Sequence, residues 1–146
     1  MDHVVYLDHK AKELLNMILG KKNMIVRGAM GIKIPYDKVF KNDLLYFVEN
    51  KGELVVKAKA IVEDVYFSNK LSREDSFTLL DQHQSKLLLN TALKKRFAGK
   101  RYITLITLKD FAELKFPFEI DNSTFSSMDD WLMVKNIDCV RVKQEA

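Results

Sequence analysis

The chain has 146 residues, of which 47% are hydrophobic and 30% are charged, and its net charge at pH 7 is +4. This length suits one domain that buries roughly 70% of its unfolded surface, and five glycines with two prolines leave no room for a disordered linker. We therefore expect a single compact domain over residues 1–146.

Three further observations bear on the cellular compartment of the protein. The single cysteine, Cys139, excludes an intramolecular disulfide. The N-terminal segment MDHVVYLDHK is interrupted by charge before the apolar region of a signal peptide develops, and no apolar stretch approaches the roughly 20 residues that cross a bilayer. We expect a cytoplasmic protein with no membrane partner.

The positive charge is concentrated in two segments. Between residues 20 and 41 one acid, Asp37, accompanies six bases: Lys21, Lys22, Arg27, Lys33, Lys38 and Lys41. Between residues 93 and 101 no acid accompanies five bases: Lys94, Lys95, Arg96, Lys100 and Arg101. If the two segments meet in space, they form a surface that attracts anions.

The first expected element is a helix within residues 8–20. Its apolar residues recur with helical spacing: Ala11, Leu14, Leu15 and Ile18. Asp8 fits an N-cap and Gly20 a C-terminal stop. A strand rich in β-forming residues is expected at 23–28, and a long surface loop without sustained periodicity follows at 29–43.

A hairpin is expected next, with arms at 44–49 and 53–67. The connection between them ends in Gly52, which supplies the left-handed residue that such a turn requires. The second arm alternates, so one face is expected to be core: Leu54, Val56, Ala58, Ala60 and Val62. The opposite face is expected to be wet: Lys57, Lys59 and Glu63.

Two helices and a strand complete the predicted order. A capping pattern from Ser72 to Asp75 begins one helix, and a second short helix is expected to end at Gly99. Residues 101–111 are β-branched and aromatic, which is typical of a central strand.

Beyond Pro117 the apolar residues show only weak periodicity. We expect Trp131 to fold back onto the core and Asp129 to be a turn or cap residue.

This order predicts the fold class. Strands do not alternate regularly with helices, which disfavours a doubly wound parallel sheet and favours a mainly antiparallel sheet or small barrel with helices beside it. We therefore expect an α+β fold.

Several segments together resemble the ASCH family: ILGKK, the strand ending in Arg27, the hairpin LLYFVENKGELVVKAKAIVEDV, and GKRYITLITLKDFAELKFPFEID. The similarity covers roughly residues 4–137, and within the ASCH family the chain resembles the bacterial-type members. The resemblance implies a PUA-like, mainly antiparallel small β-barrel with flanking helices.

The family motif is a glycine, a lysine two residues on, an acid three beyond and an arginine two further. Gly20, Lys22 and Arg27 match it, whereas Ile25 stands at the acidic position. The resemblance implies a cleft, lined by the motif, in which members are proposed to bind RNA or nucleotides. Some small relatives are amidohydrolases that cleave acetylated cytidine with this lysine, a threonine three residues later and a more distant glutamate.

Ile25 also occupies that threonine position. An alkyl side chain can neither attack a carbonyl nor pass on a proton, so we assign no catalytic residue and lean toward a binding module. An amidohydrolase or ribonuclease-like enzyme remains the alternative. It would use Lys22 as its ionisable group, with a lowered pKa, and a partner such as Glu63 or Tyr46.

The residues allow two interpretations of the motif strand. With a period of two, Asn23, Ile25 and Arg27 share a face, where the amide could pair with a base edge and the guanidinium could fork onto phosphate. In the other interpretation Ile25 is core and Arg27 pairs with a carboxylate such as Glu49 or Glu63. Lys21 and Lys22 follow a helix C-terminus, where a cation is favourable by about 0.3–1 kcal/mol.

The second basic segment offers aromatic side chains as well. Phe97 and Tyr102 lie among its bases, a combination that suits single-stranded nucleic acid, although a wet helix face with a buried Phe97 would give the same pattern. The candidate ligand-binding residues are Lys21, Lys22, Asn23, Arg27, Glu49, Lys100 and Arg101, and the expected partner is RNA or a nucleotide.

Other chemistry has little support in the sequence. His3, His9, His83 and Cys139 are scattered and make no zinc-type spacing, so we expect no metal. The glycines of RGAMGIK lack the ending of a phosphate loop, and we expect no cofactor. A protein-interaction domain using the loop at residues 29–42 is a third possibility.

Overall fold

The computed structural model describes residues 1–49, 51, 52, 54–121 and 130–142. The strands of this part of the chain are β1 (Asp2–Leu7), β2 (Met24–Ala29), β3 (Leu44–Glu49), β4 (Val55–Phe67), β5 (Tyr102–Glu119) and β6 (Trp131–Val134). The helices are α1 (Glu13–Ile18), α2 (Arg73–Gln82), α3 (Gln84–Leu87), α4 (Thr91–Phe97) and the 3₁₀ helix η2 (Ile137–Cys139).

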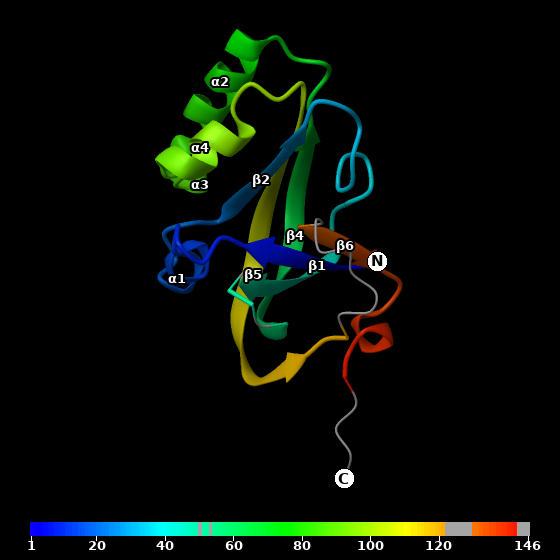
Figure 1. The fold of residues 1–146 in the computed structure, drawn as a ribbon. Helices are drawn as coiled ribbons and strands as arrows, with labels where there is room; N and C mark the ends of the chain where they lie inside the picture. Colours follow the sequence, from blue (N-terminus) through cyan, green and yellow to red (C-terminus); the bar gives the residue numbers. More distant parts are fainter. Residues whose placement is uncertain (50, 53, 122–129, 143–146) are drawn as a thin grey trace.

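The strands form one sheet in the order β2-β5-β4-β3-β1-β6. All neighbouring pairs are antiparallel except β1 and β3, which are parallel. The long strands β4 and β5 curve so that the sheet curls into a half-barrel, and α2, α3 and α4 lie together beside β2 (Figure 1). The predicted α+β class, with a mainly antiparallel sheet and flanking helices, is confirmed.

Strand β1 was not predicted from the sequence. This strand lies between β3 and β6, and both of its faces are buried, because Val4 and Val5 belong to two different core clusters. A strand that is buried on both faces reads as a continuous apolar run instead of an alternating one. The run HVVYL therefore carried no periodic signal.

Helix α1 is shorter than expected and turned to another face. Lys12 has a left-handed backbone (φ 56°), so the helix begins at Glu13, and Asp8 caps only the preceding turn by accepting from the Ala11 amide at 2.9 Å. Leu15 is 47% exposed. The buried face is formed by Glu13, Leu14 and Met17, because the Glu13 carboxylate turns inward to meet a buried lysine described below.

Most of the remaining elements agree with the predictions, but the one helix expected from Ser72 onward is two, α2 and α3, with His83 between them, and β6 and η2 were not predicted. The hairpin pairs β3 with β4, and its expected core face is buried from Val56 to Val62. Ser72 caps α2 through the Asp75 amide. Strand β5 starts where expected but continues to Glu119, since its second half pairs with the start of β4.

Strand β2 separates two cores. Ile25 is fully buried on the inner side of the curled sheet, in the cluster that also holds Phe47 and Trp131. Met24 and Val26 face the other way, into the cluster beneath α2, α3 and α4. The interpretation of Ile25 as a core residue is confirmed, and so is the packing of Trp131.

A buried histidine links strand β1 to its sheet neighbour β6. His3 is fully buried. Its Nδ1 accepts a hydrogen bond from Trp131 Nε1 at 3.0 Å, and its Nε2 lies 2.9 Å from Asp43 Oδ2. Because an indole nitrogen can only donate, His3 must be neutral with its proton on Nε2, from which it donates to Asp43.

Acidification is expected to weaken the fold through this histidine. Burial lowers the pKa of His3 from 6.5, although the hydrogen bond to Asp43 opposes the shift. As the pH falls, His3 is protonated in the unfolded chain before it is protonated in the folded chain. The contribution of neutral His3 to the free energy of unfolding is therefore complete above pH 6.5 and is lost as the pH falls toward the pKa of His3 in the folded chain. Urea denaturation from pH 7 to 5 should show a loss of at most about 1.4 kcal/mol per pH unit.

His3→Gln provides the comparison, because its amide can donate to Asp43 but does not titrate. Its stability should fall less over this range than that of the wild type, whereas His83→Gln, outside this network, should follow the wild type. Parallel pH profiles for the wild type and His3→Gln would contradict the assignment.

Candidate functional site

Arg27 is the motif residue at the centre of the candidate site. It stands near the end of β2 and is only 6% exposed. Its two terminal nitrogens donate to the carbonyls of Val26 at 2.7 Å and Tyr6 at 2.5 Å. Its Nε lies 3.3 Å from Asp130 Oδ2 but makes no hydrogen bond with any described residue. One buried N–H of Arg27 is therefore not satisfied.

A pocket of about 160 Å³ adjoins this guanidinium. Its lining combines cations, aromatic rings and one carboxylate: Arg27, Lys33, Arg96, Lys100, Tyr36, Phe97, Tyr102 and Asp130, together with Gly28, Ala29, Gly31, Ile34, Pro35 and Thr104. Arg27 and Lys33 come from the first basic segment, and Arg96 and Lys100 come from the second. The two segments therefore meet in space, at this pocket.

Asp130 links the arginines of the two segments. Its Oδ2 lies 2.9 Å from a terminal nitrogen of Arg96 and 3.3 Å from Nε of Arg27. The Phe97 ring lies against both guanidinium groups, 5.1 Å from that of Arg96 and 5.8 Å from that of Arg27. Carboxylate and ring together hold the two cations at one wall of the pocket.

Two tyrosines and a close backbone approach also shape the pocket. Tyr36 packs edge-on against Tyr102 with ring centroids 5.5 Å apart, and its hydroxyl donates to the Ser68 carbonyl. A Cβ atom at Gly28 would lie 3.2 Å from Lys100 Cβ. Glycine thus lets Lys100 approach β2 closely enough to line the pocket.

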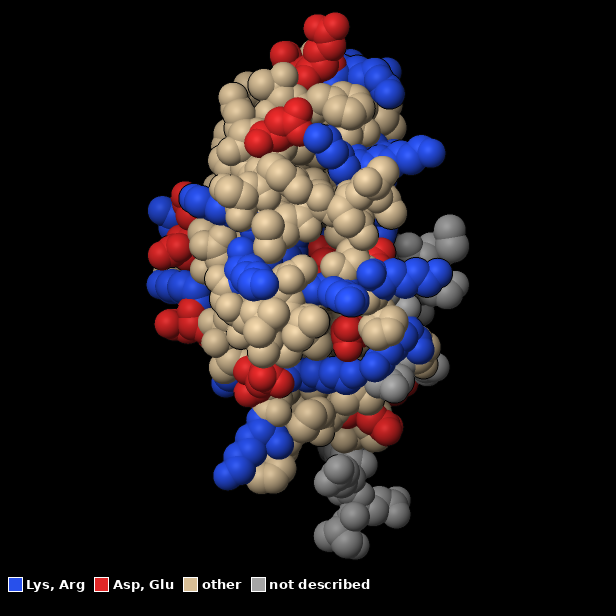
Figure 2. Space-filling model, turned by 90° about the vertical axis from the view of Figure 1, so that its left-hand side faces the viewer, with Lys and Arg blue, Asp and Glu red and all other residues tan. Residues whose placement is uncertain are grey.

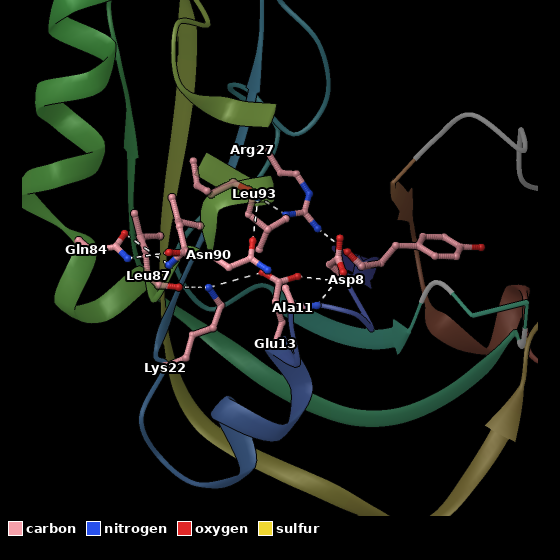
Figure 3. A network of polar contacts seen from close by, with 12 residues as sticks. Asp8, Ala11, Glu13, Lys22, Arg27, Gln84, Leu87, Asn90 and Leu93 are labelled. Carbon is pink, nitrogen blue, oxygen red and sulfur yellow. Dashed lines mark hydrogen bonds and ion pairs between the residues drawn. The ribbon is translucent and has the colours of Figure 1, made fainter. Parts of the chain in front are cut away.

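Lys22, the second matching cation of the motif, lies in a buried network that Figure 3 draws together with Arg27, but it does not line the pocket. It is 3% exposed. Its Nζ donates to the Leu87 carbonyl at the end of α3 and lies 3.5 Å from Glu13 Oε1. The other Glu13 oxygen accepts from the Asp8 amide at 2.7 Å. Burial lowers the pKa of Lys22, although the nearby Glu13 carboxylate opposes the shift.

The other predicted site residues lie outside this pocket. Lys21, Asn23 and Arg101 are exposed. Glu49 is paired with His9 at 3.2 Å and Lys57 at 3.3 Å.

Arg27 and Lys100 are thus the two candidates that the structure brings together. The carboxylate beside Arg27 is Asp130, not Glu49 or Glu63. Asp129, expected to be a turn or cap residue, lies outside the described residues. Lys33, Tyr36, Arg96 and Asp130 were not among the predicted site residues. Lys33 and Arg96 belong to the two basic segments, and the signal for Asp130 was the acidic pair beside Trp131.

The surface charge is mixed beyond the pocket. Figure 2 shows the face that carries the helices, where Lys and Arg side chains are spread with Asp and Glu between them. No single basic field covers that face, so attraction for an anion must be local. Among the described residues, no group of three or more His, Cys, Asp or Glu side chains could hold a metal ion. No helix of the described chain is long and apolar enough to cross a membrane.

Comparisons with known proteins bear on the fold. No protein-family model matches the sequence, and no curated protein does either. Among solved structures, the chain is similar to the ASCH protein of Zymomonas mobilis, with a TM-score of 0.64 and 16% identity over 92% of this chain and 87% of that one.

Crystal structures of two point mutants of this Zymomonas mobilis protein both give a TM-score of 0.66, at 14% and 15% identity. Each match covers 94% of this chain, with 93% of the first mutant chain and 91% of the second. At such identities the likeness concerns the fold alone. The chain therefore has an ASCH-like fold, as the motif segments imply.

Proposed function

We propose that this chain is a module that binds RNA or a nucleotide in the pocket beside Arg27. The observation that carries the proposal is the convergence of four cations and three aromatic rings around a single carboxylate. Cations neutralise phosphate, and flat rings stack with bases, so the two kinds of side chain together suit single-stranded nucleic acid.

The size of the pocket limits what it can hold. Its volume of about 160 Å³ is similar to that of a cavity of roughly 150 Å³ that takes one benzene molecule. It therefore accommodates one base or one phosphate group, with the rest of the ligand outside. Arg27, Lys33, Arg96 and Lys100 supply the positive charge of its lining.

Binding accounts for the geometry better than hydrolysis does. The buried Lys22 has the lowered pKa that the enzyme alternative requires, but its ammonium group is held by Leu87 and Glu13 and does not line the pocket. Ile25, at the position of the family threonine, is packed in the core. Neither Glu63 nor Tyr46 lines the pocket with Arg27.

Lys100→Ala and Arg101→Ala form a matched test of the pocket. Both remove one positive charge from adjacent positions, but only Lys100 lines the pocket. By fluorescence anisotropy with a labelled single-stranded RNA at low salt, Lys100→Ala should weaken binding about tenfold, the value of one charge-assisted hydrogen bond. The plot of log affinity against log salt concentration has a negative slope, which should become shallower by roughly 0.7. Arg101→Ala should change the affinity and this slope much less.

Two outcomes would refute the proposal. One is the absence of binding to RNA, single-stranded DNA and free nucleotides at low salt. The other is an equal effect of the two substitutions, which would indicate diffuse charge instead of a site. The same incubations, sampled for RNA integrity, address the enzyme alternative: cleavage by the purified wild type that disappears in Lys22→Met, at a temperature where this variant remains folded, would favour it.

A further inference from the structure

A second cavity opens at the far end of β5 from the pocket. We call it the distal groove; its volume is about 590 Å³, and six of its lining residues carry the argument: Lys59, Lys115, Phe116, Phe118, Lys135 and Arg141. An adjoining cavity of about 770 Å³ shares Phe116, Phe118 and Arg141 with it. Figure 1 shows the end of β5 and η2 at the opposite end of the molecule from α4 and the loop after β2.

The distal groove has an excess of unpaired positive charge. Within the described part of the chain, Lys59, Lys115 and Lys135 make no ion pair. Its acidic residues are already engaged: Asp2 accepts from the Ile137 amide at 2.8 Å, and Asp138 lies 3.6 Å from Arg141. Three lysines are therefore available to an anion.

One aromatic side chain of the groove, Phe116, is placed for stacking. Phe116 is 76% exposed, with the Lys115 ammonium 5.6 Å from its ring centroid. The guanidinium of Arg141 lies 3.9 Å from the centroid of Phe118, which also packs against Tyr46. An exposed phenylalanine beside a cation gains little from the fold itself but offers a flat face to a base.

We infer that the distal groove is a second binding site for single-stranded nucleic acid. The lysines follow the phosphates, and Phe116 stacks with a base, the arrangement by which single strands are held without sequence preference. The distal groove, at about 590 Å³, has more room than the pocket beside Arg27, at about 160 Å³. The inference shares its ligand class with the proposed function but none of its residues, so either can fail alone.

The single cysteine of the chain gives a local readout. Cys139 is exposed and stands in η2, next to Asp138 of the groove. An environment-sensitive fluorophore attached to Cys139 of the full chain should change its emission when a 15-nucleotide oligouridylate fills the groove. Lys100→Ala, in the other pocket, should leave the change at saturation intact.

Phe116→Ala and Lys115→Ala test the groove directly. Each should weaken anisotropy binding of the 15-mer at least fivefold and reduce the emission change at a given RNA concentration. The controls are Phe40→Ala, a similarly exposed phenylalanine outside the groove, and Lys109→Ala, an exposed lysine of the same strand. Both should bind as the wild type does. Phe116 is so exposed that its removal should leave Tm unchanged, which excludes unfolding as the cause.

The inference is overturned if the 15-mer binds without changing emission at Cys139. It is equally overturned if the groove variants and their controls bind alike, or if the 15-mer does not bind at all. Loss of binding in Lys100→Ala with an unchanged groove response would support both sites. Loss in the groove variants alone would support the groove and count against the pocket.

Discussion

Lys22→Met is expected to lower the free energy of unfolding by about 3–5 kcal/mol, the usual cost of removing one member of a buried ion pair. The substitution leaves the Glu13 carboxylate, which is 5% exposed, without its cation, and it removes the donor to the Leu87 carbonyl. For a chain of this size the Tm should fall by about 10 °C. Urea denaturation and calorimetry measure the two quantities.

Two companion variants make this result specific. Lys21→Ala removes the exposed neighbouring lysine and should change stability by at most about 0.5 kcal/mol. In the double variant Glu13→Gln Lys22→Met the remaining partner is neutral, and at least half of the loss should be recovered. If the effects of Glu13→Gln and Lys22→Met simply add, the two side chains are not coupled and our account of the network is wrong.

Arg27→Ala is expected to be comparably destabilising, by about 3 kcal/mol or more. It removes two hydrogen bonds to buried carbonyls and a guanidinium packed between Phe97 and Trp131. Each carbonyl left without a donor costs about 1–3 kcal/mol. The variant should also lose affinity for RNA in the anisotropy assay, measured at a temperature where it remains folded.

Arg96→Ala distinguishes the loss of a cation beside Asp130 from the loss of a buried, packed guanidinium, which occurs in Arg27→Ala. Arg96 also pairs with Asp130, but its side chain is 51% exposed. An exposed ion pair contributes about 0–1 kcal/mol, so this variant should remain nearly as stable as the wild type while still removing a cation from the pocket. Equal stability losses in Arg27→Ala and Arg96→Ala would contradict the structural role given to Arg27.

Local chemistry made part of the site predictable. The motif glycine, lysine and arginine identified Arg27, and the basic composition of residues 93–101 identified Lys100. The period-two argument was right that Ile25 and Arg27 lie on one side of β2, but that side faces the core. Arg27 reaches the pocket because it stands near the end of the strand. Asn23 precedes the strand, which begins at Met24.

The rest of the site depends on contacts between residues far apart in the sequence, which local sequence patterns do not predict. Asp130 meets Arg27 only because β6 pairs with β1, a strand that sequence periodicity did not reveal. Tyr36 enters the pocket from a loop without a regular period. Glu13 is buried because it faces Lys22, whereas an acidic residue on a short helix is ordinarily expected in solvent.

The position of β1 in the sheet has a consequence for synthesis. One of its edges pairs with β3, which is complete at residue 49, but the other pairs with β6, which is complete only at residue 134. At 5–20 residues per second, roughly 4–17 seconds separate these events on the ribosome. During that interval the second edge presents free amides and carbonyls to any other nascent chain. A strand enclosed on both sides in the finished protein is thus vulnerable chiefly while the protein is being made.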